Sequence, residues 1–122
     1  MNLLIVDDDI IILQAMKTFL EKENFTCHTT TDADEGLKVL NKSETDIDLV
    51  ITDIMMPYKS GIELLTEIRE ITTELPIIIV AALDRREVLE VAFTLGAVDF
   101  VKKPVNITQI APTLANLLQI QE

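Results

Sequence analysis

Cysteine, glycine and aromatic residues are scarce in this chain of 122 residues. It has one cysteine, Cys27, three glycines, one tyrosine and no tryptophan. A single cysteine excludes an intrachain disulfide and fits a reducing compartment. Internal repeats, linkers and low-complexity stretches are also missing from the sequence, so we expect one domain spanning residues 1–122.

Basic residues and long apolar runs are scarce as well. The chain has ten Lys and Arg residues and 21 Asp and Glu residues, which gives a net charge of −11. Such an acidic surface repels nucleic acid and anionic lipid, so we expect no direct contact with nucleic acid or a membrane. The longest apolar run, Ile77–Leu83, has seven residues, far below the ~20 of a membrane-spanning helix. Acidic residues from Asp7 onwards leave no room for a secretion signal, and we expect a cytoplasmic protein.

Short apolar runs alternate with helical patterns along the chain. Strands without polar alternation are covered on both faces, which predicts an α/β fold with a doubly wound parallel sheet. Five strands are predicted, at residues 3–6, 25–30, 47–52, 77–81 and 99–102. Apolar residues at helical spacing predict five helices, at residues 10–23, 33–40, 62–72 and 85–95, with a last one that ends near residue 119.

Capping residues and prolines predict where these helices begin. Asp9 is expected to cap the first helix, Thr31 or Asp32 the second, and Asp84 the fourth. Pro112 leaves two alternatives for the last helix. Either it begins after Asn106 and is kinked by the proline, or it begins near residue 111 with the proline in its first turn.

Carboxylates follow two of the predicted strands. Asp7, Asp8 and Asp9 come directly after the first apolar run, and Asp53 follows the third. In an open α/β sheet, ligands bind at the carboxyl ends of the strands. If these two strands are neighbours, the carboxylates converge and raise one another's pKa. A hard divalent cation would hold them ionised, and Mg²⁺ suits one or two carboxylates with waters and a phosphate.

The same residues resemble the receiver (response-regulator) domain of two-component signal transduction, in the CheY-like superfamily. The resemblance covers essentially the whole chain, and its motifs are specific in their order and spacing. It implies a flavodoxin-like sheet of strand order 2-1-3-4-5 with five helices. The matching motifs are Asp7-Asp8, Asp53 with Met56-Pro57 beyond it, Gly96-Ala97 and Lys103-Pro104.

The resemblance implies a role for each residue of the acidic site. Asp53 is the expected phosphoacceptor, which forms an aspartyl-phosphate. Asp8 is expected to ligate Mg²⁺ directly and Asp7 through water, with Asp53 and the backbone carbonyl of Met55 completing the set and Mn²⁺ as a substitute. Lys103 is expected to supply the ammonium group that neutralises phosphoryl charge.

Four further positions flank this site or transmit its state. Ala81 stands where the family usually has Thr or Ser, so the usual hydroxyl contact to the phosphoryl group is missing, and Phe100 occupies the aromatic switch position. Leu83 and Met55 flank the approach of water, which predicts a long-lived phosphorylated form. The bond between Lys103 and Pro104 is expected to be cis.

The resemblance implies a phosphoacceptor signalling module. The chain is expected to be no enzyme beyond Mg²⁺-dependent self-phosphorylation and slow autodephosphorylation. Its expected partners are a sensor histidine kinase or a histidine phosphotransfer protein, and a second copy bound through the face of the fourth helix, fifth strand and fifth helix. The domain stands alone or forms the N-terminal part of a longer regulator.

Three other functions compete with that of a phosphoacceptor module. The alternative is a pseudo-receiver that acts without phosphorylation, motivated by Ala81. A hydrolase of the haloacid dehalogenase type needs a second Asp two residues after the nucleophile, where this chain has Met55. A dinucleotide site needs a Gly-rich turn after the first strand, where this chain has three aspartates.

Overall fold

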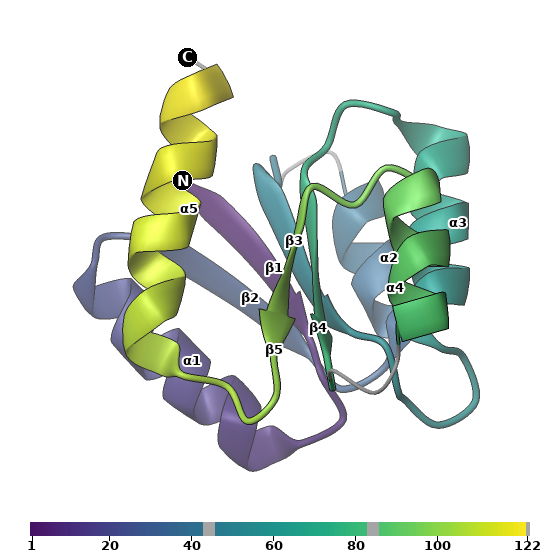
Figure 1. Cartoon of the computed structure of the whole chain (residues 1–122). Helices are drawn as coiled ribbons and strands as arrows, with labels where there is room; N and C mark the ends of the chain where they lie inside the picture. Colours follow the sequence, from purple (N-terminus) through teal and green to yellow (C-terminus); the bar gives the residue numbers. More distant parts are fainter. Residues whose placement is uncertain (43–45, 83–85, 122) are drawn as a thin grey trace.

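Five parallel strands form one sheet in the order β2-β1-β3-β4-β5, as the resemblance to receiver domains implied. The structure is a computed structural model that describes residues 1–42, 46–82 and 86–121 (Figure 1). Its strands are β1 (Asn2–Val6), β2 (Thr26–Thr30), β3 (Leu49–Asp53), β4 (Ile77–Ala81) and β5 (Asp99–Lys102).

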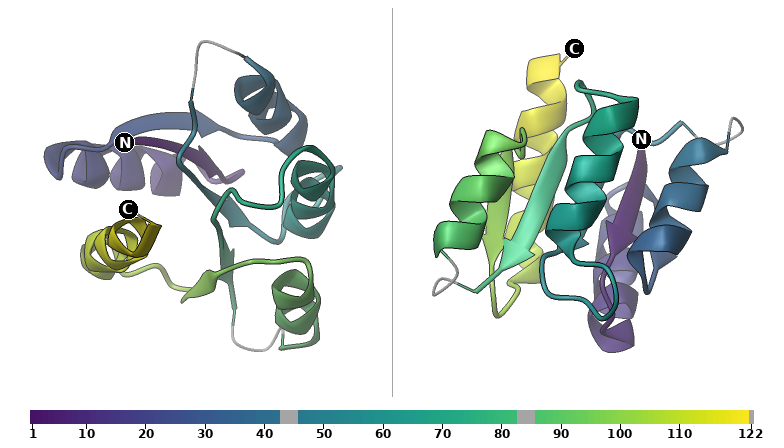
Figure 2. Two further views of the ribbon diagram at one scale, coloured as in Figure 1. Left: turned by 90° about the horizontal axis from the view of Figure 1, so that it is seen from above. Right: turned by 90° about the vertical axis from the view of Figure 1, so that its right-hand side faces the viewer.

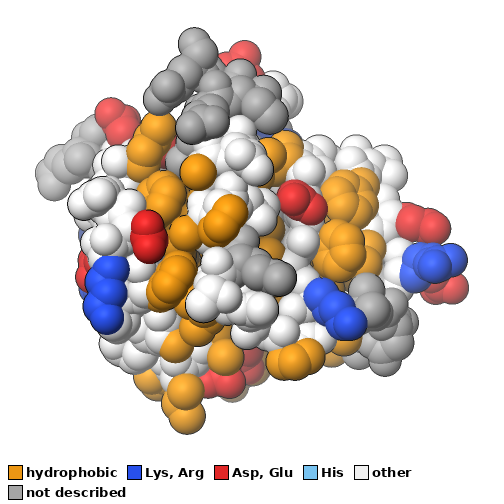
Figure 3. Space-filling view, turned by 60° about the vertical axis from the view of Figure 1, so that its left-hand side comes forward, with side chains coloured by type: hydrophobic (Ala, Val, Ile, Leu, Met, Phe, Trp, Pro, Cys, Tyr) orange, Lys and Arg blue, Asp and Glu red, His pale blue; other side chains and the backbone are white. Residues whose placement is uncertain are grey.

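Five helices cover the two faces of the sheet. Figure 2 shows α1 and α5 on one face and α2, α3 and α4 on the other. Figure 3 shows hydrophobic side chains gathered where α1 and α5 lie side by side. The helices are α1 (Ile10–Lys22), α2 (Ala33–Asn41), α3 (Gly61–Ile71), α4 (Arg86–Thr94) and α5 (Ile107–Gln121). In the described part of the chain, no helix is both long enough and apolar enough to cross a membrane.

The apolar runs form strands because both of their faces are buried. Successive strand residues point to opposite faces. In β1, Leu4 and Val6 therefore pack into the core under α2, α3 and α4, while Leu3 and Ile5 pack into the core under α1 and α5. Every residue of β3 and β4 is buried. This burial agrees with the interior position of both strands in the sheet.

The helix starts agree with the capping residues in the sequence. The Asp9 carboxylate accepts hydrogen bonds from the backbone N–H groups of residues 11 and 12. Asp32 rather than Thr31 caps α2, by accepting from the Glu35 N–H at 2.8 Å. Ser60 caps α3, so Gly61 is the first helical residue and not the end of a loop. The predicted cap Asp84 lies outside the described residues.

The structure decides between the two predicted starts of α5 and corrects the predicted start of β3. The helix α5 begins at Ile107 and contains Pro112, so the alternative start near residue 111 is wrong. The exposed proline ring leaves the buried contacts of Ile110 and Leu114 intact. The strand β3 begins at Leu49, two residues later than predicted, because Ile47 lines a cleft at the amino edge of the sheet.

Candidate functional site

The carboxyl edge of the sheet brings three aspartates together. Parallel pairing of β1 with β3 sets Val6 beside Thr52, so Asp7 and Asp53 leave the sheet next to each other. One carboxylate oxygen from each of Asp7, Asp8 and Asp53 lies within 4.8 Å of the other two. The Asp53 and Asp7 residues are only 2% and 4% exposed, whereas Asp8 reaches solvent.

The Asp53 carboxylate is held from two sides. The Lys103 ammonium group donates to its Oδ2 at 2.9 Å, and the backbone N–H of Met55 donates to its Oδ1 at 3.2 Å. Lys103 follows β5, and its own N–H donates to the carbonyl of Ala81 at the end of β4. The peptide bond between Lys103 and Pro104 is cis. The carboxyl ends of strands β3, β4 and β5 thus fix the positions of the Asp53 carboxylate and the Lys103 ammonium group.

Asp7 has the most perturbed environment in this cluster. The pKa of its carboxyl group is raised from 3.8 to about 6, mainly by burial and also by the charges of Asp53 and Asp8. The hydrogen bond from the Asp9 N–H and the charge of Lys103 oppose this rise in pKa. A buried carboxyl group among other carboxylates calls for additional positive charge.

The cleft at this edge suits a hard cation. Its volume is about 470 Å³, and Met55, Lys103 and Pro104 line it beside the aspartates. The side-chain donors that converge there are carboxylate oxygens, which Mg²⁺ prefers over nitrogen or sulfur ligands. The donor set therefore fits the magnesium ion that the sequence led us to expect.

Comparison with known proteins decides the family. Residues 3–115 match the family model of the response regulator receiver domain. The chain belongs to this family. This receiver domain is 37% identical over 117 residues to the response regulator SaeR of Staphylococcus epidermidis and 35% identical over 117 residues to SaeR of Staphylococcus aureus. Each match covers 96% of this chain and 50% of the relative, so the chain spans about half the length of these curated relatives.

Solved receiver domains have the same fold. A receiver domain protein from Clostridium thermocellum superimposes with a TM-score of 0.90 at 31% identity, covering 98% of this chain and 95% of that one. A response regulator receiver domain from Francisella gives a TM-score of 0.89 at 30% identity, covering 99% and 98%. The sequence-based assignment to a two-component receiver domain is thereby confirmed.

The expected switch positions of this receiver domain are Ala81 at the end of β4 and Phe100 in β5. Ala81 is 3% exposed at the end of β4. Phe100 is half-buried in β5, and its ring meets Phe93 of α4 edge to face, with centroids 6.4 Å apart. Leu83, expected to flank the site, lies outside the described residues.

Two residues that shape the connection from β3 to α3 were not recognised in the sequence: Lys59 in the loop and Gly61 at the start of α3. A Cβ atom on Gly61 would overlap the carbonyl oxygen of Asp53, so this position needs glycine to bring α3 against the strand end. The Lys59 ammonium group binds Asp34 of α2 at 2.7 Å and Glu67 of α3 at 2.9 Å. Asp34 lies 25 residues before Lys59 in the sequence, and the packing of α2 against α3 brings it to the same ammonium group as Glu67.

Proposed function

We propose that the chain is a phosphoacceptor signalling module in which Asp53 receives the phosphoryl group. An Asp53 carboxylate oxygen attacks the phosphorus of a phosphohistidine on a sensor histidine kinase or histidine phosphotransfer protein. The P–O bond forms as the P–N bond breaks, and the imidazole leaves with the electron pair. The observation that carries the proposal is the Asp53 carboxylate held between Lys103 and the Met55 N–H inside an acidic cleft.

The other residues of the cleft have supporting roles in this proposal. Asp8 would hold Mg²⁺ directly and Asp7 through water, together with Asp53 and the backbone carbonyl of Met55. The metal, with Mn²⁺ as a substitute, supplies positive charge to the phosphoryl oxygens. Lys103 supplies further positive charge and orients the carboxylate it binds, and positioning and charge neutralisation are most of what this reaction needs.

In this proposal, phosphorylation also changes which proteins the domain binds. Residues 1–122 constitute one receiver domain whose phosphorylation alters the face formed by α4, β5 and α5. The half-buried Phe100 lies in this face and contacts Phe93. A second copy of the chain is the expected partner there, in the cytoplasm and without direct contact to nucleic acid.

A small phosphodonor tests the acceptor role. The protein is incubated with acetyl phosphate or phosphoramidate and Mg²⁺, and the intact mass is measured. We expect a gain of one phosphoryl group in the wild type, none in Asp53→Asn, and a strongly raised Mg²⁺ requirement in Asp8→Ala. Glu90→Gln, which neutralises an exposed carboxylate of α4, serves as the matched control. Labelling of Asp53→Asn at the wild-type rate would contradict the assignment.

A phosphorylation-independent pseudo-receiver is the second candidate, because buried Ala81 offers no hydroxyl donor to a phosphoryl group. It predicts no mass gain in the wild type with either phosphodonor. It also predicts the same binding to the partner protein with and without the donor.

A further inference from the structure

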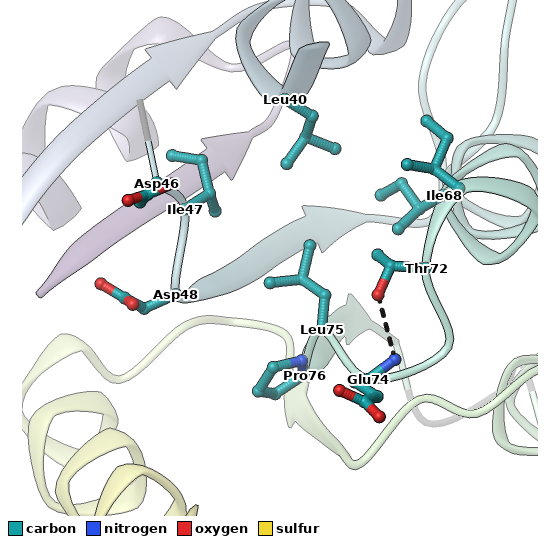
Figure 4. A pocket seen from close by; sticks show the side chains of 10 residues that line it. Leu40, Asp46, Ile47, Asp48, Ile68, Thr72, Glu74, Leu75 and Pro76 are labelled. Atoms are coloured by element: carbon teal, nitrogen blue, oxygen red, sulfur yellow. Dashed lines mark hydrogen bonds between the residues drawn. The ribbon is translucent and has the colours of Figure 1, made fainter. Parts of the chain in front are cut away.

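A second cleft lies at the opposite edge of the sheet, next to the amino ends of β3 and β4. Its volume is about 390 Å³, and the last turns of α2 and α3 form its sides. Figure 4 shows apolar side chains from α2, α3 and the segments before β3 and β4 converging on it, with the carboxylates of Asp46 and Asp48 turned outward at its rim. The proposed phosphorylation chemistry uses none of these residues.

The floor of this amino-edge cleft is apolar. Leu40 of α2, Ile47 and Leu75 point toward one another above the buried Ile68 of α3 (Figure 4). These first three side chains are only partly buried, although they pack against the core under α2, α3 and α4. A ligand with an apolar body would remove this surface from water, at about 25 cal/mol for each Å² of apolar area.

The surroundings of the cleft are acidic. Asp46, Asp48 and Glu74 line it, and among the described residues no Lys or Arg side chain lines it. The nearby Arg69 guanidinium group is occupied by backbone carbonyls of the wall. The described part of the chain shows no ion pair for these three carboxylates. Asp48 accepts a hydrogen bond from the Asn2 N–H. With a net charge of −11 over the whole chain, the local potential favours a cation.

One wall of the cleft is held in place by Arg69. Its guanidinium group donates to the carbonyls of Thr72 and Leu75 in the wall, at 3.2 and 2.9 Å. It also donates to the carbonyls of Leu95 and Gly96, beyond the end of α4, at 3.0 and 2.9 Å. The wall is therefore tied to a second element, and a preformed site binds without the cost of ordering it.

We infer that the amino-edge cleft is a binding site for a small organic cation with an apolar body, such as an arylalkylammonium ion. The apolar body covers the floor, and the ammonium group faces the carboxylates at the mouth. A volume of about 390 Å³ falls in the range of small-molecule sites. This ligand class follows from apolar floor, acidic mouth and fixed wall together, and it is independent of phosphoryl transfer.

The test compares three probes of one shape and different charge. Mg²⁺-saturated protein, labelled with ¹⁵N, is titrated with 2-phenylethylammonium, 2-phenylethanol and 3-phenylpropionate, and amide shifts are followed by NMR. We expect the ammonium ion to shift amides around Leu40, Ile47 and Leu75, the alcohol to bind there more weakly, and the carboxylate least. Equal responses to all three probes, or ammonium shifts confined to the Asp53 edge, overturn the inference.

Two variants separate the charge from the apolar floor. Asp46→Asn combined with Glu74→Gln is expected to weaken binding of the ammonium ion roughly 3- to 10-fold, as for two exposed ion pairs, and to leave binding of the alcohol unchanged. Leu40→Phe fills the cleft and is expected to weaken both probes. Unchanged ammonium affinity in the double variant overturns the inference, and this variant keeps the core intact if Leu40→Phe fails to fold.

Discussion

The carboxyl group of Asp7 is almost completely buried and yet ionises near neutral pH. Burial raises its pKa from 3.8 to about 6, so the native state binds this proton more tightly than the unfolded chain. The contribution of Asp7 to the stability of the metal-free protein therefore falls as pH rises from about 4 through 6. The full loss, roughly 3 kcal/mol, applies above the native pKa.

Replacement of Asp7 by asparagine should reverse this loss. Asn keeps an oxygen that can accept the Asp9 N–H but carries no charge. We expect Asp7→Asn to raise the free energy of unfolding near pH 7.5 and to change it far less near pH 4, in urea denaturation with EDTA present. An equal gain at both pH values would show that the benefit does not come from the buried charge.

In the proposed mechanism, Ala81 limits how strongly a phosphoryl group on Asp53 can act on the face formed by α4, β5 and α5. A threonine there would restore a hydroxyl donor, worth on the order of 1 kcal/mol or somewhat more to a charged acceptor. A ligand shifts an equilibrium only by its differential contacts with the two states. We expect Ala81→Thr to enlarge the amide shift changes on α4, β5 and α5 after beryllofluoride addition.

Valine is the matched control at this position, because it has the shape of threonine without the hydroxyl. Ala81→Val should leave the beryllofluoride response at the level of the wild type. Equal responses of the Thr and Val variants would assign any change to packing at this buried position rather than to the hydroxyl.

The sequence located the aspartates of the acidic site, because Asp7-Asp8 and Asp53 follow apolar runs. The role of Lys103 came from the resemblance to the receiver family, and the structure brings its ammonium group to 2.9 Å from the Asp53 carboxylate. Gly61 and Lys59 could not be located in either way. The need for glycine at residue 61 comes from contact with the Asp53 carbonyl, and the partners of Lys59 lie on two separate helices. Such contacts have no signature in local sequence.

The β3–α3 loop is anchored through Lys59, whose partners raise the pKa of its ammonium group. This loop carries Met55, the residue proposed to offer a backbone carbonyl to the metal. We expect Lys59→Met to weaken Mg²⁺ binding by about a few-fold, in isothermal titration at low salt, because the loop loses its ties to α2 and α3. Lys59→Arg should retain most of the affinity.

Salt distinguishes this mechanism from damage to the fold. Exposed ion pairs are screened as ionic strength rises. The difference between wild type and Lys59→Met should therefore shrink at high salt. A deficit of the same size at every salt concentration would contradict an electrostatic anchor.

The last helix contains a removable defect. Pro112 is the sixth residue of α5, where it cannot donate to the carbonyl of Thr108, and its ring is exposed. We expect Pro112→Ala to raise the free energy of unfolding by about 1–3 kcal/mol in urea denaturation. Pro57→Ala, in the β3–α3 loop, should give no gain, because a loop proline restricts the unfolded chain. A gain from both changes would exclude the helix as its source.

Periodicity predicted all five strands and helices, but not every boundary. The two alternatives for α5 were equally compatible with the local pattern, and the contacts of Ile110 and Leu114 with the core decide between them. Ile47 is as apolar as a strand residue, yet it lies before β3 and lines the amino-edge cleft. Tertiary packing, which a local window does not contain, sets these limits.

The acidic site exists only in the complete sheet. Asp7 and Asp8 follow β1, Asp53 ends β3 and Lys103 follows β5, so unfolding separates the first two from Asp53 and from Lys103. A cation that binds this cluster stabilises the native state alone. The resulting gain is RT ln(1 + [L]/Kd), or about 2.7 kcal/mol when the free ligand is at 100 times Kd.

Magnesium should therefore stabilise the whole molecule. We expect the melting temperature to rise with the logarithm of Mg²⁺ concentration, and we expect Asp8→Ala to lose this rise. Because a net charge of −11 also responds to general screening, each sample is matched in ionic strength with NaCl. Glu90→Gln lowers the acidity without touching the cluster and should keep the full Mg²⁺ effect. If Asp8→Ala gains as much from Mg²⁺ as Glu90→Gln does, the stabilisation arises from diffuse charge and not from a site at the carboxyl edge of the sheet.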